Sequence, residues 1–279
     1  MSGSIQIHDT AFMTSSYRSS NENLSRDIYA QLWNNQKTDD WIRDLMKEVS
    51  PFEPLLHCLR NRFFLDRIEQ LWKQREIEIL INFGCGFSMY PYLLDSRLQH
   101  IEIDTEEIIR YKKKKTVLWE SKNLLPERDI HYISTNFKML NISSLTDQIL
   151  SLIGDKPSFI LLEGVIFFLE PEEINQLFFL FDTIQKEKGL IGSVSFLPEE
   201  QEKMVFKNLI QFFQNKIDPN FNYQLIKDSF YLGLKNYDLI EKQNYMGLSK
   251  LYEGASEMEL TEQTILNEQL YLLKKTQND

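Results

Sequence analysis

Long apolar runs are absent from this sequence, and cysteine is scarce. No apolar stretch reaches the roughly 20 residues that a membrane-spanning helix needs, and the first residues lack the basic and apolar regions of a signal peptide. The two cysteines, Cys58 and Cys85, are too few for a disulfide framework or a thiolate metal site. Free thiols suit a reducing compartment, so we expect a cytoplasmic protein without a membrane segment.

Positive charge is in deficit, because 31 Lys and Arg face 41 Asp and Glu among 279 residues. The formal net charge of -10 at pH 7 argues against a broad surface for nucleic acid. We interpret the one basic run, residues 110–115, as a solvated helix face on which Lys112 could reach a ligand cleft. No metal site is predicted, because the four histidines lack the spacing of metal ligands: His8, His57, His100 and His131.

From residue 77 onward, short β-rich runs alternate with helical runs. This alternation predicts an α/β fold, a Rossmann-like doubly wound sheet that is mostly parallel, with an antiparallel strand near the C-terminus. The predicted strands are 77–83, 101–104, 130–134, 159–164 and 190–196, with further candidates at 237–245 and 269–273.

Helices are predicted between these strands, and two of them begin with proline followed by two acidic residues, at Pro171 and Pro198. Residues 1–75 also read as helical, so we predict an N-terminal helical cap over 1–75 packed on a main domain over 76–279. Segment 253–267 is compatible with helix or loop. The helices expected in the main domain are 89–94, 106–120, 144–153, 171–186 and 198–216.

The turn Gly84-Cys85-Gly86 follows the first predicted strand, and the next strand ends in acidic residues about twenty positions later. Glycine lets the backbone turn sharply beside a ligand, and a carboxylate can accept hydrogen bonds from both ribose hydroxyls. The third glycine of the dinucleotide fingerprint is missing from residues 88–91, which disfavours an NAD-dependent oxidoreductase. We interpret Cys85 as a small residue that the turn requires, in preference to a nucleophile.

Glu163 is the one acidic residue inside the apolar run 159–169. A buried carboxylate needs a cationic or hydrogen-bonding partner, since leaving it unpaired costs several kcal/mol. Glu163 is therefore a candidate ligand-binding residue, with a structural salt bridge as the alternative.

The order of these motifs resembles the class I S-adenosylmethionine-dependent methyltransferases, and more closely the leucine carboxyl methyltransferase family, which includes polyketide-type O-methyltransferases. The resemblance rests on motifs spread over residues 8–173. They are Asp9-Thr10-Ala11 with Tyr17-Arg18, a helix with Asp27 and Ala30, and the segments 59–64, 84–87, 100–104 with Lys112, and 161–173.

This resemblance implies S-adenosyl-L-methionine as the cofactor and assigns roles to eight residues. Arg60 is expected at the cofactor's carboxylate, Gly84 and Gly86 beneath its methionine part, Asp104 and Glu102 at its ribose, Asn136 and Phe137 near its adenine, and Glu163 near its amino group. Two positions depart from the family pattern. Residues 87–90 replace Leu-Asp-Thr-Arg, and Asn136 replaces an acidic residue.

The resemblance also implies an O-methyltransferase, a monomer or homodimer, that acts on a carboxylate or hydroxyl of a small-molecule or protein acceptor. A carboxylate is already ionised near neutral pH, whereas a phenol benefits from a general base. No catalytic residue can be identified from the sequence, and a methyltransferase-like binding module without activity stays an alternative. The aromatic residues expected around the acceptor are Phe212, Phe213, Phe221, Tyr223, Phe230, Tyr231 and Tyr245.

Overall fold

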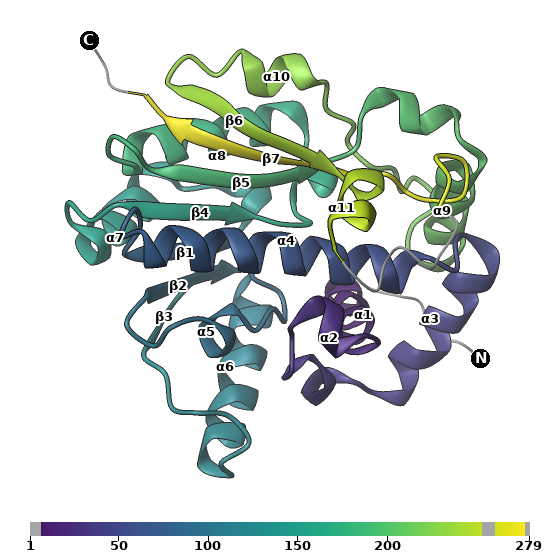
Figure 1. Ribbon diagram of the computed structural model, residues 1–279, viewed down its shortest axis with the longest axis horizontal. Coiled ribbons are helices and arrows are strands. Elements are labelled where there is room, and N and C mark those ends of the chain that lie inside the picture. Colours follow the sequence, from purple (N-terminus) through teal and green to yellow (C-terminus); the bar gives the residue numbers. More distant parts are fainter. Residues whose placement is uncertain (1–6, 253–259, 277–279) are drawn as a thin grey trace.

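The computed structural model describes residues 7–252 and 260–276, which form a seven-stranded sheet flanked by helices (Figure 1). The strand order is β3-β2-β1-β4-β5-β7-β6, and β7 is antiparallel to both of its neighbours while the other pairs are parallel. The predicted fold class is therefore confirmed. The strands are β1 Ile79–Phe83, β2 Gln99–Asp104, β3 Ile130–Ser134, β4 Ser158–Leu162, β5 Leu190–Ser195, β6 Tyr237–Asn244 and β7 Gln269–Lys275.

The centre of the sheet is covered on both faces, and every residue of β1, β4 and β5 is buried. This burial explains why these strands read as continuous apolar runs, since a strand with only one buried face alternates apolar and polar residues. Strand β6, at the sheet edge, shows that alternation. Because β2, β1, β4 and β5 pair in parallel, their carboxyl ends lie at the same edge of the sheet.

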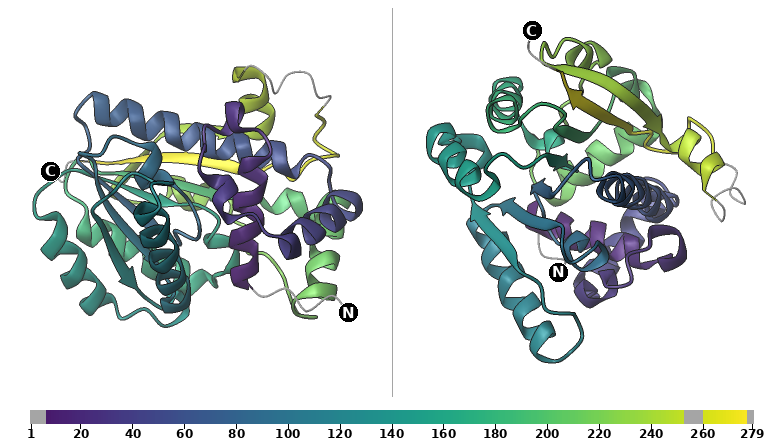
Figure 2. Two further views of the ribbon diagram at one scale, coloured as in Figure 1. Left: turned by 90° about the horizontal axis from the view of Figure 1, so that it is seen from below. Right: turned by 60° about the vertical axis from the view of Figure 1, so that its left-hand side comes forward.

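Helix α4 (Glu53–Lys73) crosses in front of the sheet in Figure 1, and α7 (Ile142–Ile153) and α8 (Pro171–Ile184) lie on the opposite side in Figure 2. The remaining helices are α1 Ile7–Ser19, α2 Glu22–Ser25, α3 Gln36–Glu48, α5 Tyr90–Leu93, α6 Glu106–Ser121, α9 Met204–Lys216, α10 Asp228–Leu232 and α11 Tyr245–Leu251. Short 3₁₀ helices span Ala30–Trp33, Phe137–Met139, Ile166–Phe168 and Pro198–Glu202.

The helix predicted over 198–216 is interrupted. Lys203 takes an extended conformation, with φ -73° and ψ 141°, between the 3₁₀ helix and α9. The side chain of Lys203 binds the buried carboxylate of Glu200 at 2.6 Å. Of the segment 253–267, residues 253–259 lie outside the described residues, and the rest is turn and irregular structure.

Helices α1 to α3 gather beyond the carboxyl ends of the parallel strands, where α1 packs against α4 (Figure 1). This placement puts the N-terminal segment over the edge at which open α/β sheets bind ligands. The division into a cap over 1–75 and a main domain over 76–279 stays a prediction. Among the described helices, none has the length and apolar character to cross a bilayer.

Candidate functional site

A cavity of about 540 Å³, the large cavity, lies at the carboxyl ends of β1, β2 and β4, with α1 on its opposite wall. This volume falls in the range of roughly 300 to 1,000 Å³ that is typical of small-molecule and cofactor sites. Seven of the eight predicted site residues line it, and they come from five separate segments of the chain. These seven are Arg60, Gly84, Gly86, Asp104, Asn136, Phe137 and Glu163.

The turn after β1 requires glycine for two reasons. Gly84 has φ +67° and Gly86 has φ +44°, which lie in the left-handed region that side chains disfavour. A Cβ atom on Gly84 would also lie 1.9 Å from Cγ2 of Val165. The turn is tied to β2, because Gly84 N–H donates to the carbonyl of Ile103 at 2.8 Å. The loop after β1 therefore packs tightly against the loop after β4.

Asp104 ends β2 and points into the large cavity beside this turn. Its Oδ2 accepts from the Gly86 N–H at 2.8 Å, and its Oδ1 accepts from the Thr105 N–H at 2.7 Å. Burial raises the pKa of Asp104, and the two backbone donors oppose that shift. Each carboxylate oxygen keeps a further lone pair, so the side chain can accept two more hydrogen bonds from a ligand.

Glu102 is the one predicted site residue that does not line the large cavity. It is buried and ion-paired with Lys112, whose ammonium also lies 3.5 Å from the carbonyl of Cys85. Burial raises the pKa of Glu102, and the Lys112 charge opposes that shift. The pair therefore supports the glycine turn from behind.

The basic run 110–115 is solvated as predicted except at Lys112, which is fully buried. The helical repeat explains the exception, because Lys112 lies on the same face of α6 as Ile108, Thr116 and Trp119, which are also buried. The interpretation of the whole run as a solvated face was therefore wrong at this position. A lysine inside a run of lysines gives no sequence signal of burial.

Glu163, after β4, is bound through both of its oxygens. Oε1 accepts from Nε of Arg60 at 2.8 Å, and Oε2 accepts from the hydroxyl of Tyr90 at 2.9 Å. Arg60 also donates from Nη1 to both oxygens of Glu268, at 2.9 and 2.8 Å. One buried guanidinium therefore joins two carboxylates. Its Nη2 makes no hydrogen bond within residues 7–252 and 260–276, and it faces Gly164.

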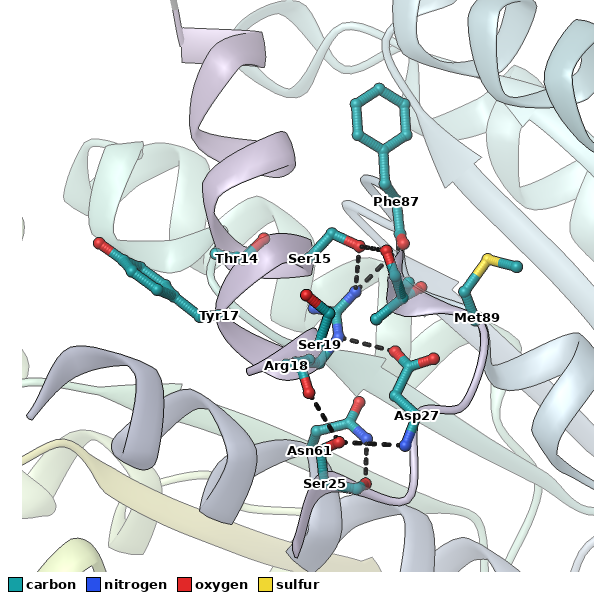
Figure 3. A network of polar contacts seen from close by, with 12 residues as sticks. Thr14, Ser15, Tyr17, Arg18, Ser19, Ser25, Asp27, Asn61, Phe87 and Met89 are labelled. Atoms are coloured by element: carbon teal, nitrogen blue, oxygen red, sulfur yellow. Dashed lines mark hydrogen bonds and ion pairs between the residues drawn. The ribbon is translucent and has the colours of Figure 1, made fainter. Parts of the chain in front are cut away.

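Arg18 is a lining residue that the sequence reasoning did not select. It is buried, and its Nε donates to Asp27 at 2.9 Å while Nη2 donates to the Phe87 carbonyl at 3.1 Å (Figure 3). Ser25 donates to the Arg18 carbonyl at 2.8 Å, which completes a network between α1 and the glycine turn. The available signal was the Tyr17-Arg18 signature with Asp27 downstream, since a buried arginine needs such an acidic partner.

The segment that departs from the family pattern, residues 87–90, is fixed by contacts of its own. Phe87 stacks on Trp33, with ring centroids 4.3 Å apart and planes at 18°. Ser88 donates to the Cys85 carbonyl at 2.8 Å and accepts from Asn82 at 2.9 Å. Tyr90 is bound to Glu163, and Phe87 and Ser88 line the large cavity, so the altered segment is held in place at its wall.

A second cavity of about 90 Å³, the small cavity, adjoins the large one and shares Thr10, Thr14, Arg60, Gly164 and Phe168 with it. Among the seven aromatic residues expected around an acceptor, Phe213 and Tyr223 line it. The other five pack in or against the core: Phe212, Phe221, Phe230, Tyr231 and Tyr245.

Asn136 and Phe137 lie at the far end of the large cavity, after β3. The Asn136 side chain accepts from the Lys138 N–H at 3.0 Å and so caps the short helix Phe137–Met139. This bond uses the carbonyl oxygen of the amide, which leaves its NH₂ group as a donor toward the cavity.

Comparison with known proteins agrees with this geometry. The family model of leucine carboxyl methyltransferase matches residues 10–182. No curated protein matches the chain. The fold is similar to that of a DUF574 family protein from Streptomyces avermitilis MA-4680, with TM-score 0.65 and 11% identity over 98% of each chain. It is similar also to a putative methyltransferase from Thermobifida fusca YX, with TM-score 0.65 and 10% identity over 99% of this chain and 97% of that chain.

Since the family match covers more than half of the chain and contains every residue that lines the large cavity, this protein belongs to the leucine carboxyl methyltransferase family and is an S-adenosyl-L-methionine-dependent methyltransferase.

Proposed function

We propose that this enzyme is an O-methyltransferase that acts on a carboxylate or hydroxyl oxygen of a small-molecule or protein acceptor. The observation that supports this best is the junction of the two cavities at Arg60, Gly164 and Phe168. The large cavity has the size of a cofactor site, and the small cavity meets it beside the proposed methionine end. An acceptor group held in the small cavity would therefore lie next to the donor.

The residues of the large cavity fit S-adenosyl-L-methionine. Asp104 has two free acceptor positions for ribose hydroxyls, and the Asn136 amide can donate at the edge of the adenine beside Phe137. Nη2 of Arg60 is a donor for the cofactor's carboxylate, and Glu163 is an acceptor near its amino group. We do not place Glu102 at the ribose, because it is bound to Lys112 behind the glycine turn.

The cofactor supplies an activated methyl group on a sulfonium sulfur. The contribution of the protein is to orient the two reactants and to exclude water, which accounts for much of the rate in such transfers. The buried network of Arg60, Glu163 and Tyr90 serves orientation, because Arg60 binds two carboxylates and Glu163 is bound by both Arg60 and Tyr90. A cytoplasmic location and a monomeric or homodimeric state stay predictions.

Calorimetry with S-adenosyl-L-methionine and with NAD tests the cofactor assignment. We expect binding of the first and none of the second. Binding of NAD alone would contradict the proposal, and binding of neither would favour a binding module without catalysis. A screen of phenols, carboxylic acids and peptide C-termini for release of S-adenosylhomocysteine then tests the methyl transfer.

A further inference from the structure

The small cavity contains polar groups that the cofactor assignment does not use. Glu53, His57 and Arg60 lie at i, i+4 and i+7 of α4, so they share one face of that helix, and all three line the small cavity. Tyr17 from α1 lies opposite, with its ring centroid 4.7 Å from that of His57. Apolar and aromatic residues complete the walls, among them Phe168, Phe213 and Tyr223.

Two buried polar atoms in this cavity lack partners. Oε1 of Glu53 and the hydroxyl of Tyr17 make no hydrogen bond to any described residue, although Glu53 is only 5% exposed and Tyr17 only 4% exposed. More than nine in ten buried polar groups are hydrogen-bonded, because an unmade bond costs about 1 to 3 kcal/mol. A ligand that donates a hydrogen bond to Glu53 would remove this cost.

The neighbouring charges do not satisfy Glu53. Arg60 is already bound to Glu163 and to both oxygens of Glu268. These three side chains together carry two negative charges and one positive charge before Glu53 is counted. The ring of His57 is engaged by the Glu53 backbone carbonyl at 2.9 Å, and its Nδ1 lies 3.9 Å from Oε2 of Glu53. A further carboxylate would enter a site that is already net negative.

We infer that the small cavity is the acceptor subsite, that it takes a neutral aromatic alcohol in preference to a carboxylate, and that Glu53 is the catalytic base that receives the hydroxyl proton. This inference rests on the proposed O-methyl transfer and narrows its acceptor class. In the step, the acceptor O–H bond breaks and its proton goes to Glu53. The oxygen–methyl bond forms as the sulfur–methyl bond breaks, and that electron pair stays on sulfur, which becomes a thioether.

Glu53 is a better base than His57 in this site. Burial, together with the charge of Glu268, raises the pKa of Glu53 to about 8, and a base is most effective when its pKa is near the working pH. Burial and the charges of Arg60 and Arg18 hold the pKa of His57 well below its ordinary value. The other titratable groups near Glu53 are Tyr17, Tyr223 and Tyr245, whose pKa values are raised by burial, and Glu268, which is bound to Arg60.

The test compares 4-methylphenol with 4-methylbenzoate, which share a ring and differ in the acceptor group. Binding of each to the enzyme saturated with S-adenosylhomocysteine is measured by calorimetry at pH 8.5, and initial rates are measured with S-adenosyl-L-methionine. We expect the phenol to bind about tenfold or more tightly than the benzoate, a difference of about 1.4 kcal/mol. Tighter binding of the benzoate would overturn the inference.

Glu53→Gln removes the proposed base and keeps the size of the side chain, so it tests the role of the carboxylate without changing the shape of the small cavity. We expect it to slow methylation of 4-methylphenol by about 100-fold or more, the range of general base catalysis, and to abolish the rise in rate as pH approaches 8. Glu53→Asp keeps a carboxylate and should retain part of the rate. Glu48→Gln, at an exposed glutamate of α3, is the matched control and should keep the full rate.

Two outcomes would overturn the role of Glu53. One is an unchanged rate and pH profile in Glu53→Gln, and the other is a loss that occurs in His57→Gln and not in Glu53→Gln. The affinity for S-adenosyl-L-methionine and the melting temperature are measured for every variant, which excludes unfolding as the cause. If the wild-type enzyme binds the cofactor but prefers the benzoate, this inference fails while the proposed function stands; if it does not bind the cofactor, the proposed function itself fails.

Discussion

The hydroxyl of Tyr90 donates a hydrogen bond of 2.9 Å to Oε2 of Glu163, from the position at which the family's glycine motif ends in arginine. A neutral donor thus lies beside a buried carboxylate. Glu163 keeps a charge partner because Arg60 binds its other oxygen at 2.8 Å. Tyr90, in the segment that departs from the family pattern, therefore shares Glu163 with Arg60.

Tyr90→Phe should weaken binding of S-adenosyl-L-methionine modestly. The variant removes one hydrogen bond to a charged group, worth about 1.5 to 3 kcal/mol, but Arg60 still holds Glu163 in place, so we expect a loss near tenfold. Tyr92→Phe is the matched control, because Tyr92 is also buried but donates to Glu120 outside the large cavity. Calorimetry on both variants checks this, and equal affinities would contradict a role for Tyr90 in the site.

Asp104→Ala should weaken cofactor binding about 100-fold. It removes a carboxylate that has acceptor positions for two ribose hydroxyls, and it leaves the Gly86 N–H without its partner. Asp155→Ala, at an aspartate that is 95% exposed at the side chain, should have no effect. An unchanged affinity in Asp104→Ala, measured by the same titration, would refute the ribose assignment.

Gly84→Ala should destabilise the protein more than Gly154→Ala. Both glycines have positive φ, 67° and 56°, and Gly154 also has ψ -127°, so both substitutions incur backbone strain of about 1 to 3 kcal/mol. Only Gly84 would also bring a Cβ within 1.9 Å of Val165, since nothing lies within 4 Å of the corresponding position at Gly154. Thermal unfolding measures the difference. Equal melting temperatures would show that the turn relaxes freely.

Lys112→Met should cost about 3 to 5 kcal/mol of unfolding free energy. The substitution leaves the buried carboxylate of Glu102 without its cation, and removing one partner of a buried ion pair typically has this effect. Lys114→Met, two residues away on the exposed face, should change stability by less than about 0.5 kcal/mol. Denaturant titration measures the unfolding free energy of both variants. Similar losses in the two would contradict this prediction.

Glu53 should make stability decrease as pH rises. Its carboxyl ionises near 4.5 in the unfolded chain and near 8 in the folded protein, so between these values the folded state binds the extra proton. The unfolding free energy then falls by up to about 1.4 kcal/mol per pH unit across that window.

Glu53→Gln should lack this decrease, and it should therefore gain stability relative to the wild type between pH 5 and pH 8. His57 acts in the opposite direction, because its depressed pKa removes stability as pH falls below its ordinary value, but it does so in both proteins. The difference between two denaturant curves measured at each pH therefore isolates Glu53. A constant difference would mean that Glu53 titrates normally.

The fold was predictable because its strands carry strong local signals. The continuous apolar runs at β1 and β4 reflect burial on both faces, and the glycines and acids that follow β1 and β2 mark the ligand edge. The break at Lys203 was not predictable, since it depends on contacts between Glu200 and the segment before β7.

Most of the residues that line the large cavity after the strands could be selected from the sequence, whereas the polar residues of the small cavity could not. Glu163 stood out as the one acid inside an apolar run, and Arg60 was expected from the family resemblance, but Glu268, which completes their network, is 208 positions away from Arg60. Only the antiparallel insertion of β7 between β5 and β6 brings Glu268 to α4. Glu53 and His57 carried no signal, because a polar face on a helix is usually solvated.

The two cavities are lined by residues from different parts of the chain. Every residue that lines the large cavity lies between Thr10 and Leu169, whereas the small cavity adds Phe196, Leu209, Phe213, Tyr223, Leu266 and Glu268 from beyond the family match. A ribosome makes about 5 to 20 residues per second, so the lining of the large cavity is synthesised several seconds before the last residues of the small cavity. The residues from beyond the family match can therefore be varied to reshape the small cavity without replacing any residue that lines the large one.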